Sequence, residues 1–175
     1  MFSEYEPGTV YWITGLSGAG KTTIGKLLYN YLRHQKPNVF FLDGDMGRLA
    51  FNDSIGYTKK ARKEGAYRNG RVCKMIAMQG IDVVCCTISM FDEVREWNKK
   101  NIANYIEVFL DVPIEVLIQR DQKGLYSKSS IGRIKDVVGL DQQPEYPKNP
   151  YLRIVNDGAI SPEDVLKKII QIIKH

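Results

Sequence analysis

The chain has 175 residues, of which 43% are hydrophobic and 26% charged, as in a single soluble domain over residues 1–175, which excludes a fibrous or disordered protein. No apolar run approaches the roughly 18 residues of a membrane span and the N-terminus has no basic leader, so we expect no membrane partner and no signal peptide. The net charge of +5 fits solvated helix faces or polyanionic ligands, and no aromatic-basic motif favours a nucleic-acid partner.

Short apolar runs alternate with helical segments along the chain. Parallel strands that are buried on both faces have such continuous apolar runs, and five are predicted at 9–14, 39–43, 82–88, 105–111 and 152–156. Helices are predicted at 21–33, 58–79, 92–101, 113–119 and 162–173. This order predicts an α/β domain with a parallel sheet of about five strands, helices on both faces, and strand 39–43 beside strand 9–14.

Two features interrupt or qualify this pattern. Segment 121–150 is rich in proline, glycine and charge and has no clear periodicity, which indicates a mobile lid or a disordered surface insertion. Cys85 and Cys86 fall within a predicted strand, and Cys73 precedes it without metal-site spacing. Cys85 and Cys86 are typical of small core residues, and the odd number of cysteines without metal-site spacing favours a reducing, cytoplasmic location.

Residues 15–22, GLSGAGKT, satisfy the P-loop pattern in full, with a predicted strand before them and a helix after them. Glycines allow the loop to curl so that backbone N–H groups point at phosphate oxygens, and the helix N-terminus adds partial positive charge. Lys21 is expected to reach the β- and γ-phosphates of ATP, and the Thr22 hydroxyl to coordinate Mg²⁺. The motif therefore predicts a P-loop fold that binds ATP with Mg²⁺.

Asp43-Gly44-Asp45 follows the second predicted strand, where ligands of open α/β sheets bind. One carboxylate can hold Mg²⁺ while the other accepts the proton of the attacking hydroxyl. The third strand offers no acid of its own, so Asp43 or Asp45 is the expected supplier of the metal-side carboxylate. The alternative is a helix N-cap, which the same residue types would also form.

Larger motifs of the chain resemble those of the adenylylsulfate kinases, the 3′-kinases of sulfate activation. The resemblance rests on GLSGAGKTT, FLDGD, TISMF, EVFLDVPIEVLIQRDQKGLY and IGRIKDVVGLDQQPEYPKNP, and it covers the chain from about residue 9 to its C-terminus. It implies a P-loop kinase fold, ATP and Mg²⁺ as cofactors, a nucleotide as the acceptor, and a homodimer.

The resemblance also implies roles for individual residues. ATP would be held by Arg120 in the lid and by the P-loop residues Gly15, Leu16, Ser17, Gly18, Ala19, Gly20, Lys21, Thr22 and Thr23. Asp43, with Thr22, would serve the metal, and Asp43, Asp45, Lys21 and Ser89 would serve catalysis, with Ser89 a substrate contact because direct in-line transfer needs no covalent step. The acceptor would be bound by Arg48, Leu49, Arg62, Arg68, Ile88, Ser89, Lys123, Gly124, Leu125 and Val137.

Departures from the family pattern concentrate on the acceptor side. Leu49 and Val137 stand where the family places aromatic rings around the substrate adenine, and Gly65 stands where it has a hydrogen-bonding Asn. Stacking is worth roughly 1–3 kcal/mol per base, so these changes predict poor binding of adenylylsulfate. Smaller aliphatic walls suit a pyrimidine, as in the cytidine diphosphoramidate kinase branch of capsule biosynthesis.

Three functions are therefore weighed. The first is a kinase that phosphorylates the 3′-hydroxyl of a nucleotide 5′-anhydride, with cytidine diphosphoramidate as the expected acceptor. The second is an adenylylsulfate kinase. The third, from another class, is a non-catalytic P-loop switch or binding module, against which stand the retained Lys21 and Asp43-Gly44-Asp45 and the absence of an Asn-Lys-x-Asp motif.

Overall fold

The computed structural model describes residues 6–51, 56–121, 124–130 and 136–173. One parallel sheet in the order β2-β3-β1-β4-β5 forms its centre. Its strands are β1 (Thr9–Thr14), β2 (Val39–Asp43), β3 (Asp82–Thr87), β4 (Asn104–Asp111) and β5 (Leu152–Val155). The five predicted strands and the α/β class are thus confirmed, with each strand boundary within one residue.

The predicted neighbour of the P-loop strand is wrong. β3 lies between β1 and β2, and Cys86 of β3 is in register with Ile13 on one side and with Asp43 on the other. The chain crosses from β1 to the sheet edge through a helix and only then returns to fill the gap. Asp43 still approaches the P-loop, because the carboxyl ends of these parallel strands meet at one edge of the sheet.

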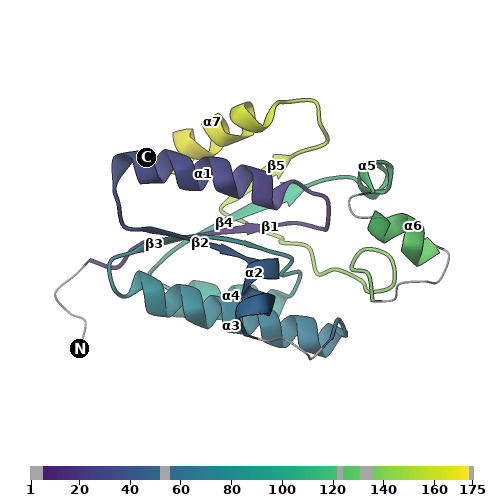
Figure 1. Ribbon diagram of the computed structural model, residues 1–175, viewed down its shortest axis with the longest axis horizontal. Helices are drawn as coiled ribbons and strands as arrows, with labels where there is room; N and C mark the ends of the chain where they lie inside the picture. The colour runs from purple at the N-terminus through teal and green to yellow at the C-terminus, as the bar shows by residue number, and fades with distance from the viewer. Residues whose placement is uncertain (1–5, 52–55, 122–123, 131–135, 174–175) are drawn as a thin grey trace.

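Helices cover both faces of the sheet, as expected (Figure 1). α1 (Lys21–Gln35) and α7 (Pro162–Ile173) lie together on one face, and α3 (Lys59–Ala77) and α4 (Asp92–Asn101) lie on the other. α5 (Ile114–Arg120) follows β4. These five helices match the predicted ones to within two residues at each end.

Two further helices are short; the first was considered only as the alternative interpretation of Asp43-Gly44-Asp45, and the second was not predicted. α2 (Gly44–Ala50) begins at Asp43, whose carboxylate caps it, and α6 (Leu125–Ser130) lies within the predicted lid segment. Glycines in α2 and serines in α6 are typical of loops, whereas α5, which is no longer than α2, consists mainly of apolar and helix-forming residues. α2 and α6 lie beyond the carboxyl edge of the sheet and help to position the site (Figure 1).

The core is divided by the sheet into two apolar clusters. Val10 and Trp12 face the α3 side, whereas Tyr11 and Ile13 face the α1 side, as alternation along a strand requires. The three cysteines are buried free thiols, as expected. Within the described parts of the chain, every helix is too short or too polar to cross a lipid bilayer.

Candidate active site

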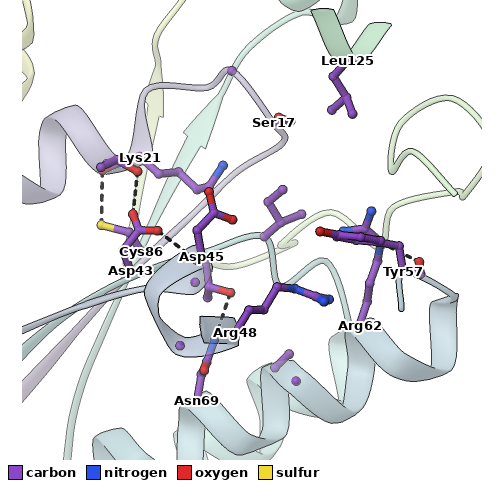
Figure 2. A pocket seen from close by; sticks show the side chains of 18 of the residues that line it. Ser17, Lys21, Asp43, Asp45, Arg48, Tyr57, Arg62, Asn69, Cys86 and Leu125 are labelled. Carbon is purple, nitrogen blue, oxygen red and sulfur yellow. Dashed lines mark hydrogen bonds between the residues drawn. The ribbon is translucent and has the colours of Figure 1, made fainter. Parts of the chain in front are cut away.

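A cavity of about 540 Å³ opens at the carboxyl edge of the sheet (Figure 2). Its walls come from the P-loop, from α1, α2 and α3, and from the end of β3, and it is bounded on the lid side by Leu125 and Val137. The two aspartates, the P-loop lysine and three arginines therefore face one space, although they are spread over nearly fifty residues of sequence.

The P-loop has the backbone conformation that phosphate binding needs. Gly18 and Gly20 adopt positive φ values of 79° and 87°, and a Cβ at Gly15 would lie 2.7 Å from the Leu110 carbonyl oxygen. α1 begins directly after Gly20 without a side-chain cap and without an acidic residue in its first turn. Its N-terminal N–H groups are therefore available to an anion.

Lys21 extends along the P-loop toward the cavity. Its Nζ donates a 2.7 Å hydrogen bond to the Leu16 carbonyl, and Figure 2 shows its side chain and that of Asp45 pointing toward one another. Burial lowers the pKa of the Lys21 ammonium to about 8, against the raising effect of Cys86, Asp43 and Asp45. A bound phosphate chain would supply the negative charge that this ammonium needs.

Thr22 and Asp43 place two oxygen ligands side by side. The Thr22 hydroxyl donates to Asp43 Oδ2 at 2.7 Å, and Asp43 Oδ1 accepts from the Asp45 backbone N–H at 2.9 Å. Asp43 is therefore the predicted helix cap and also the partner of Thr22. A hydroxyl beside a carboxylate suits Mg²⁺, which binds few protein oxygens and completes its shell with phosphate and water. Asp45 is exposed and lines the cavity from the first turn of α2.

The acceptor side of the cavity combines positive charge with an aromatic ring. The guanidinium carbons of Arg48 and Arg62 lie 4.4 Å and 5.1 Å from the centroid of the Tyr57 ring. Arg48 donates to the Gly56 carbonyl, and Arg62 donates to the carbonyls of Tyr57 and Asp136 at 2.9 Å each. Burial and the charge of Arg48 lower the pKa of Arg62, so an anion bound here would relieve their mutual repulsion.

Most of the other predicted acceptor residues also reach this cavity. Arg68, Ile88, Leu125 and Val137 line it, and so does Gly65. Gly124 is described but does not line it, and Lys123 lies outside the described residues. On the ATP side Gly15, Leu16 and Ala19 do not line the cavity, and the side chains of Leu16 and Ala19 pack into the core.

Two predicted acceptor contacts need correction. Leu49 is 83% exposed and lies outside the cavity, because successive residues of α2 are rotated by about 100° and Arg48 occupies the inward position. Ser89 is completely buried behind the cavity wall, where its backbone N–H faces the Thr14 hydroxyl at 3.4 Å. Its neighbour Ile88 faces the cavity instead, so neither Leu49 nor Ser89 is positioned to contact a substrate.

Further residues of the cavity were not among the predicted site residues, and they include two aromatic rings and a buried amide. Phe51 and Tyr57 supply aromatic rings, and Asn69 is a buried amide whose Nδ2 lies 3.5 Å from the Thr87 hydroxyl. The signal for Tyr57 was available, since it opens the same segment as Arg62 and Arg68. Phe51 lies one helical turn after Arg48 and so shares its direction, which only the presence of α2 reveals.

Arg120 does not extend into the cavity. Its NH1 donates to the Gly18 carbonyl at 3.3 Å and its NH2 donates to the Asn156 carbonyl at 3.0 Å. The guanidinium therefore contacts the P-loop backbone, rather than presenting both nitrogens to a phosphate.

Comparison with known proteins gives a consistent result. The family described as Adenylylsulphate kinase matches residues 7–155. The adenylyl-sulfate kinase of Gloeothece citriformis is 39% identical over 160 residues, covering 91% of each chain. The cytidine diphosphoramidate kinase of Campylobacter jejuni subsp. jejuni is 40% identical over 139 residues, covering 79% of this chain and 81% of that protein. The Mycobacterium tuberculosis APS kinase CysC in complex with AMPPNP and APS superposes with a TM-score of 0.89 at 32% identity, covering 97% of this chain and 99% of that one.

Proposed function

The chain belongs to the adenylylsulphate kinase family, and we propose that it phosphorylates the 3′-hydroxyl of a nucleotide 5′-anhydride, with cytidine diphosphoramidate as the acceptor. As a member of that family it is an ATP-dependent kinase that acts on a hydroxyl group, not a nucleotide switch. The steps below follow from the side chains that line the cavity.

The P-loop and Lys21 hold the triphosphate. Backbone N–H groups and the N-terminus of α1 face its oxygens, and the Lys21 ammonium moves from the Leu16 carbonyl to the β- and γ-phosphates. These positive groups stabilise the charge that spreads over the γ-phosphoryl oxygens as the bond to ADP breaks. The acceptor oxygen attacks in line, and its proton leaves to a base.

Asp45 is the proposed base and Asp43 the proposed metal-side carboxylate. Asp43 accepts from the Thr22 hydroxyl and from the N–H of Asp45, which places it beside the first turn of α1, and Asp45 lines the same cavity from the first turn of α2. Thr22 and Asp43 would hold Mg²⁺, which supplies charge neutralisation between the phosphates when it is bound. Asp45 then accepts the hydroxyl proton as the phosphoryl group is transferred.

The observation that carries the choice of cytidine is the lining by Gly65 and Val137. Both lie in the cavity with Tyr57, and neither offers a ring or a side-chain amide to a purine. Arg48, Arg62 and Arg68 provide charge for an anionic 5′ group, whichever base it carries. The similarity to the Campylobacter jejuni enzyme supports this assignment, and it would place the product in capsule phosphoramidate synthesis.

Adenylylsulfate is the second candidate, and a specific observation favours it. Phe51 and Tyr57 both line the cavity, so two aromatic rings are present even though Leu49 and Val137 are not aromatic. A ring contributes roughly 1–3 kcal/mol when a base stacks on it, which would partly offset the residues that differ. The relative from Gloeothece citriformis supports this candidate.

An acceptor screen tests the proposal. ATP and Mg²⁺ are supplied with cytidine diphosphoramidate, adenylylsulfate, CDP or CMP, and ADP release is measured, with Lys21→Ala as the inactive control. We expect the highest kcat/KM with cytidine diphosphoramidate. An equal or higher kcat/KM with adenylylsulfate would make the substrate assignment wrong and leave the kinase chemistry intact.

We also propose that the protein works as a cytoplasmic homodimer composed of one kinase domain per chain, with 121–150 as its lid. The three buried free thiols are compatible with a reducing compartment, and the dimer follows from the family resemblance. Light scattering during size-exclusion chromatography measures the mass directly, and a monomer or a larger assembly would contradict the dimer.

A further inference from the structure

The P-loop also makes contacts through its carbonyl groups. Four consecutive carbonyls each accept a hydrogen bond from a side chain, those of Leu16, Ser17, Gly18 and Ala19. Lys21 supplies the first donor from within the motif. The other three donors lie between 102 and 137 residues away in sequence.

Tyr126 of the lid helix α6 is one of these distant donors. Its hydroxyl donates to the Ser17 carbonyl at 2.9 Å, and its side chain is only 3% exposed. Burial raises the pKa of this phenol to about 12, so it remains a donor at any pH at which the protein is studied. The contact joins α6 directly to the loop that binds phosphate.

Asn156, which follows β5, is the second distant donor to a P-loop carbonyl. Its Nδ2 donates to the Ala19 carbonyl at 2.9 Å, and its backbone N–H is fixed by the Asp111 carbonyl of β4 at 2.9 Å. A Cβ at Gly20 would lie 2.9 Å from the same Nδ2, so the side chain sits directly against the loop. Arg120 connects the P-loop to Asn156, because its guanidinium donates to the carbonyls of both Gly18 and Asn156.

The geometry of a peptide bond makes these contacts relevant to ATP. In a planar trans peptide the C=O of one residue and the N–H of the next point in opposite directions. A side chain that binds the Ser17 or the Ala19 carbonyl therefore fixes the opposite direction for the N–H of Gly18 or Gly20. The Ala19 N–H between them donates to the Leu16 carbonyl at 3.2 Å. Gly18 and Gly20 allow these planes to rotate at little steric cost, so the loop itself does not fix their orientation.

We propose that Tyr126 and Asn156 are positioning residues for the phosphoryl donor: they fix the P-loop peptide planes from behind, and Tyr126 makes this dependent on the docking of α6. Neither side chain lines the cavity, so their effect reaches ATP only through the loop. Binding of ATP and docking of the lid helix then stabilise each other, because both require the same orientation of the loop.

Tyr126→Phe and Asn156→Ala test the proposal, because the first removes only the hydroxyl and the second only the amide. Each should raise the Kd for ADP and the KM for ATP by roughly 3- to 10-fold, the effect of one net hydrogen bond, and leave the KM for the acceptor within about twofold. In the double variant the increase in the Kd for ADP should be smaller than the product of the two single increases, since both residues contact the same loop. Amide exchange of Gly18 and Gly20 should be faster in either variant.

Matched controls come from exposed residues of the same types. Tyr151→Phe and Asn30→Ala should leave all of these values unchanged. The inference is overturned if both test variants bind ADP normally, or if they raise both KM values equally with a lower thermal unfolding midpoint, which indicates a purely structural role. ADP binding requires no acceptor, so an error in the acceptor assignment does not affect this test.

Discussion

The hydroxyl of Thr22 donates a 2.7 Å hydrogen bond to Oδ2 of Asp43. This contact joins the first turn of α1 to the end of β2. In the sheet, β3 separates β2 from β1, the strand that precedes α1. It forms because parallel strands present their carboxyl ends along one edge, where the loop after β1 and the cap of α2 meet. The pair supplies the two oxygens proposed for the metal.

Asp43→Asn and Asp45→Asn should each lower kcat by at least about 100-fold, since one removes the proposed metal-side carboxylate and the other the proposed base. The two are distinguishable in a Mg²⁺ titration, where only Asp43→Asn should raise the Mg²⁺ concentration needed for half-maximal rate. Thr22→Ser keeps the hydroxyl and is the control. Near-normal activity in both aspartate variants would show that the pair only caps α2.

Binding of ADP should weaken above pH 8. The pKa of Lys21 in the free protein is lowered to about 8 by burial, and bound phosphate favours the charged form and raises it. Above pH 8, binding must therefore take up a proton, and the Kd should rise by up to about tenfold per pH unit. Calorimetry in two buffers of different ionisation enthalpy measures the uptake.

The control is Lys26→Ala, which changes an exposed lysine of the same helix. ADP binding by this variant should show the same pH dependence as in the wild type. Lys21→Ala should bind ADP weakly, show no proton uptake from this group, and have no measurable turnover. A Kd for wild-type ADP binding that is constant from about pH 7 to pH 9.5 contradicts the assignment.

Tyr57→Ala should raise the acceptor KM by roughly 5- to 100-fold, the loss expected when a base no longer stacks on a ring. Tyr57→Phe retains the ring and should behave almost like the wild type. Leu49→Ala is the matched control on α2, because Leu49 is 83% exposed and outside the cavity. If Leu49→Ala raises the KM and Tyr57→Ala does not, the placement of the acceptor base is wrong.

Arg95→Met should lower the free energy of unfolding by roughly 3–5 kcal/mol, because it removes the buried cation beside Glu107 and leaves only the Lys99 ammonium, 4.0 Å from Oε2. Arg95 and Glu107 are 2% and 1% exposed, with Nε and Oε1 3.7 Å apart, and Arg95 also donates to the carbonyls of Ser89 and Glu145. Chemical denaturation measures the change. Lys167→Met removes an exposed pair with Asp164 and should leave the free energy of unfolding almost unchanged.

The double variant Arg95→Met/Glu107→Leu should recover part of the loss, because no unpaired charge then remains in the core. Equal instability in the single and double variants would show that the hydrogen bonds of Arg95 to Ser89 and Glu145, rather than the ion pair, stabilise this region.

The backbone amides of α6 (Leu125–Ser130) should exchange more slowly when ADP and an acceptor are both bound, since the lid is expected to order over the phosphates. Hydrogen exchange followed by mass spectrometry measures this, and the core strand β3 serves as an internal reference. Unchanged exchange in α6 would count against the lid.

Local signals in the sequence were sufficient to predict the strands, the longer helices and the candidate phosphate-binding residues. Continuous apolar runs located all five strands, and the P-loop and Asp43-Gly44-Asp45 were identified because loop curvature, capping and charge depend on neighbouring residues. The family resemblance added Arg48, Arg62 and Arg68, which all line the cavity. α2 and α6 contain glycine and serine residues typical of loops, so α2 was considered only as the alternative interpretation of Asp43-Gly44-Asp45 and α6 was missed.

Only the tertiary structure decided the order of the strands and which side chains reach the cavity. β3 fills the position between β1 and β2, a choice made by packing of the whole sheet and not by any one segment. The rotation of about 100° per residue in α2 turns Phe51 inward and Leu49 outward. Donation by Tyr126 and Asn156 to the P-loop carbonyls joins segments more than a hundred residues apart, and such contacts exist only after the chain has folded.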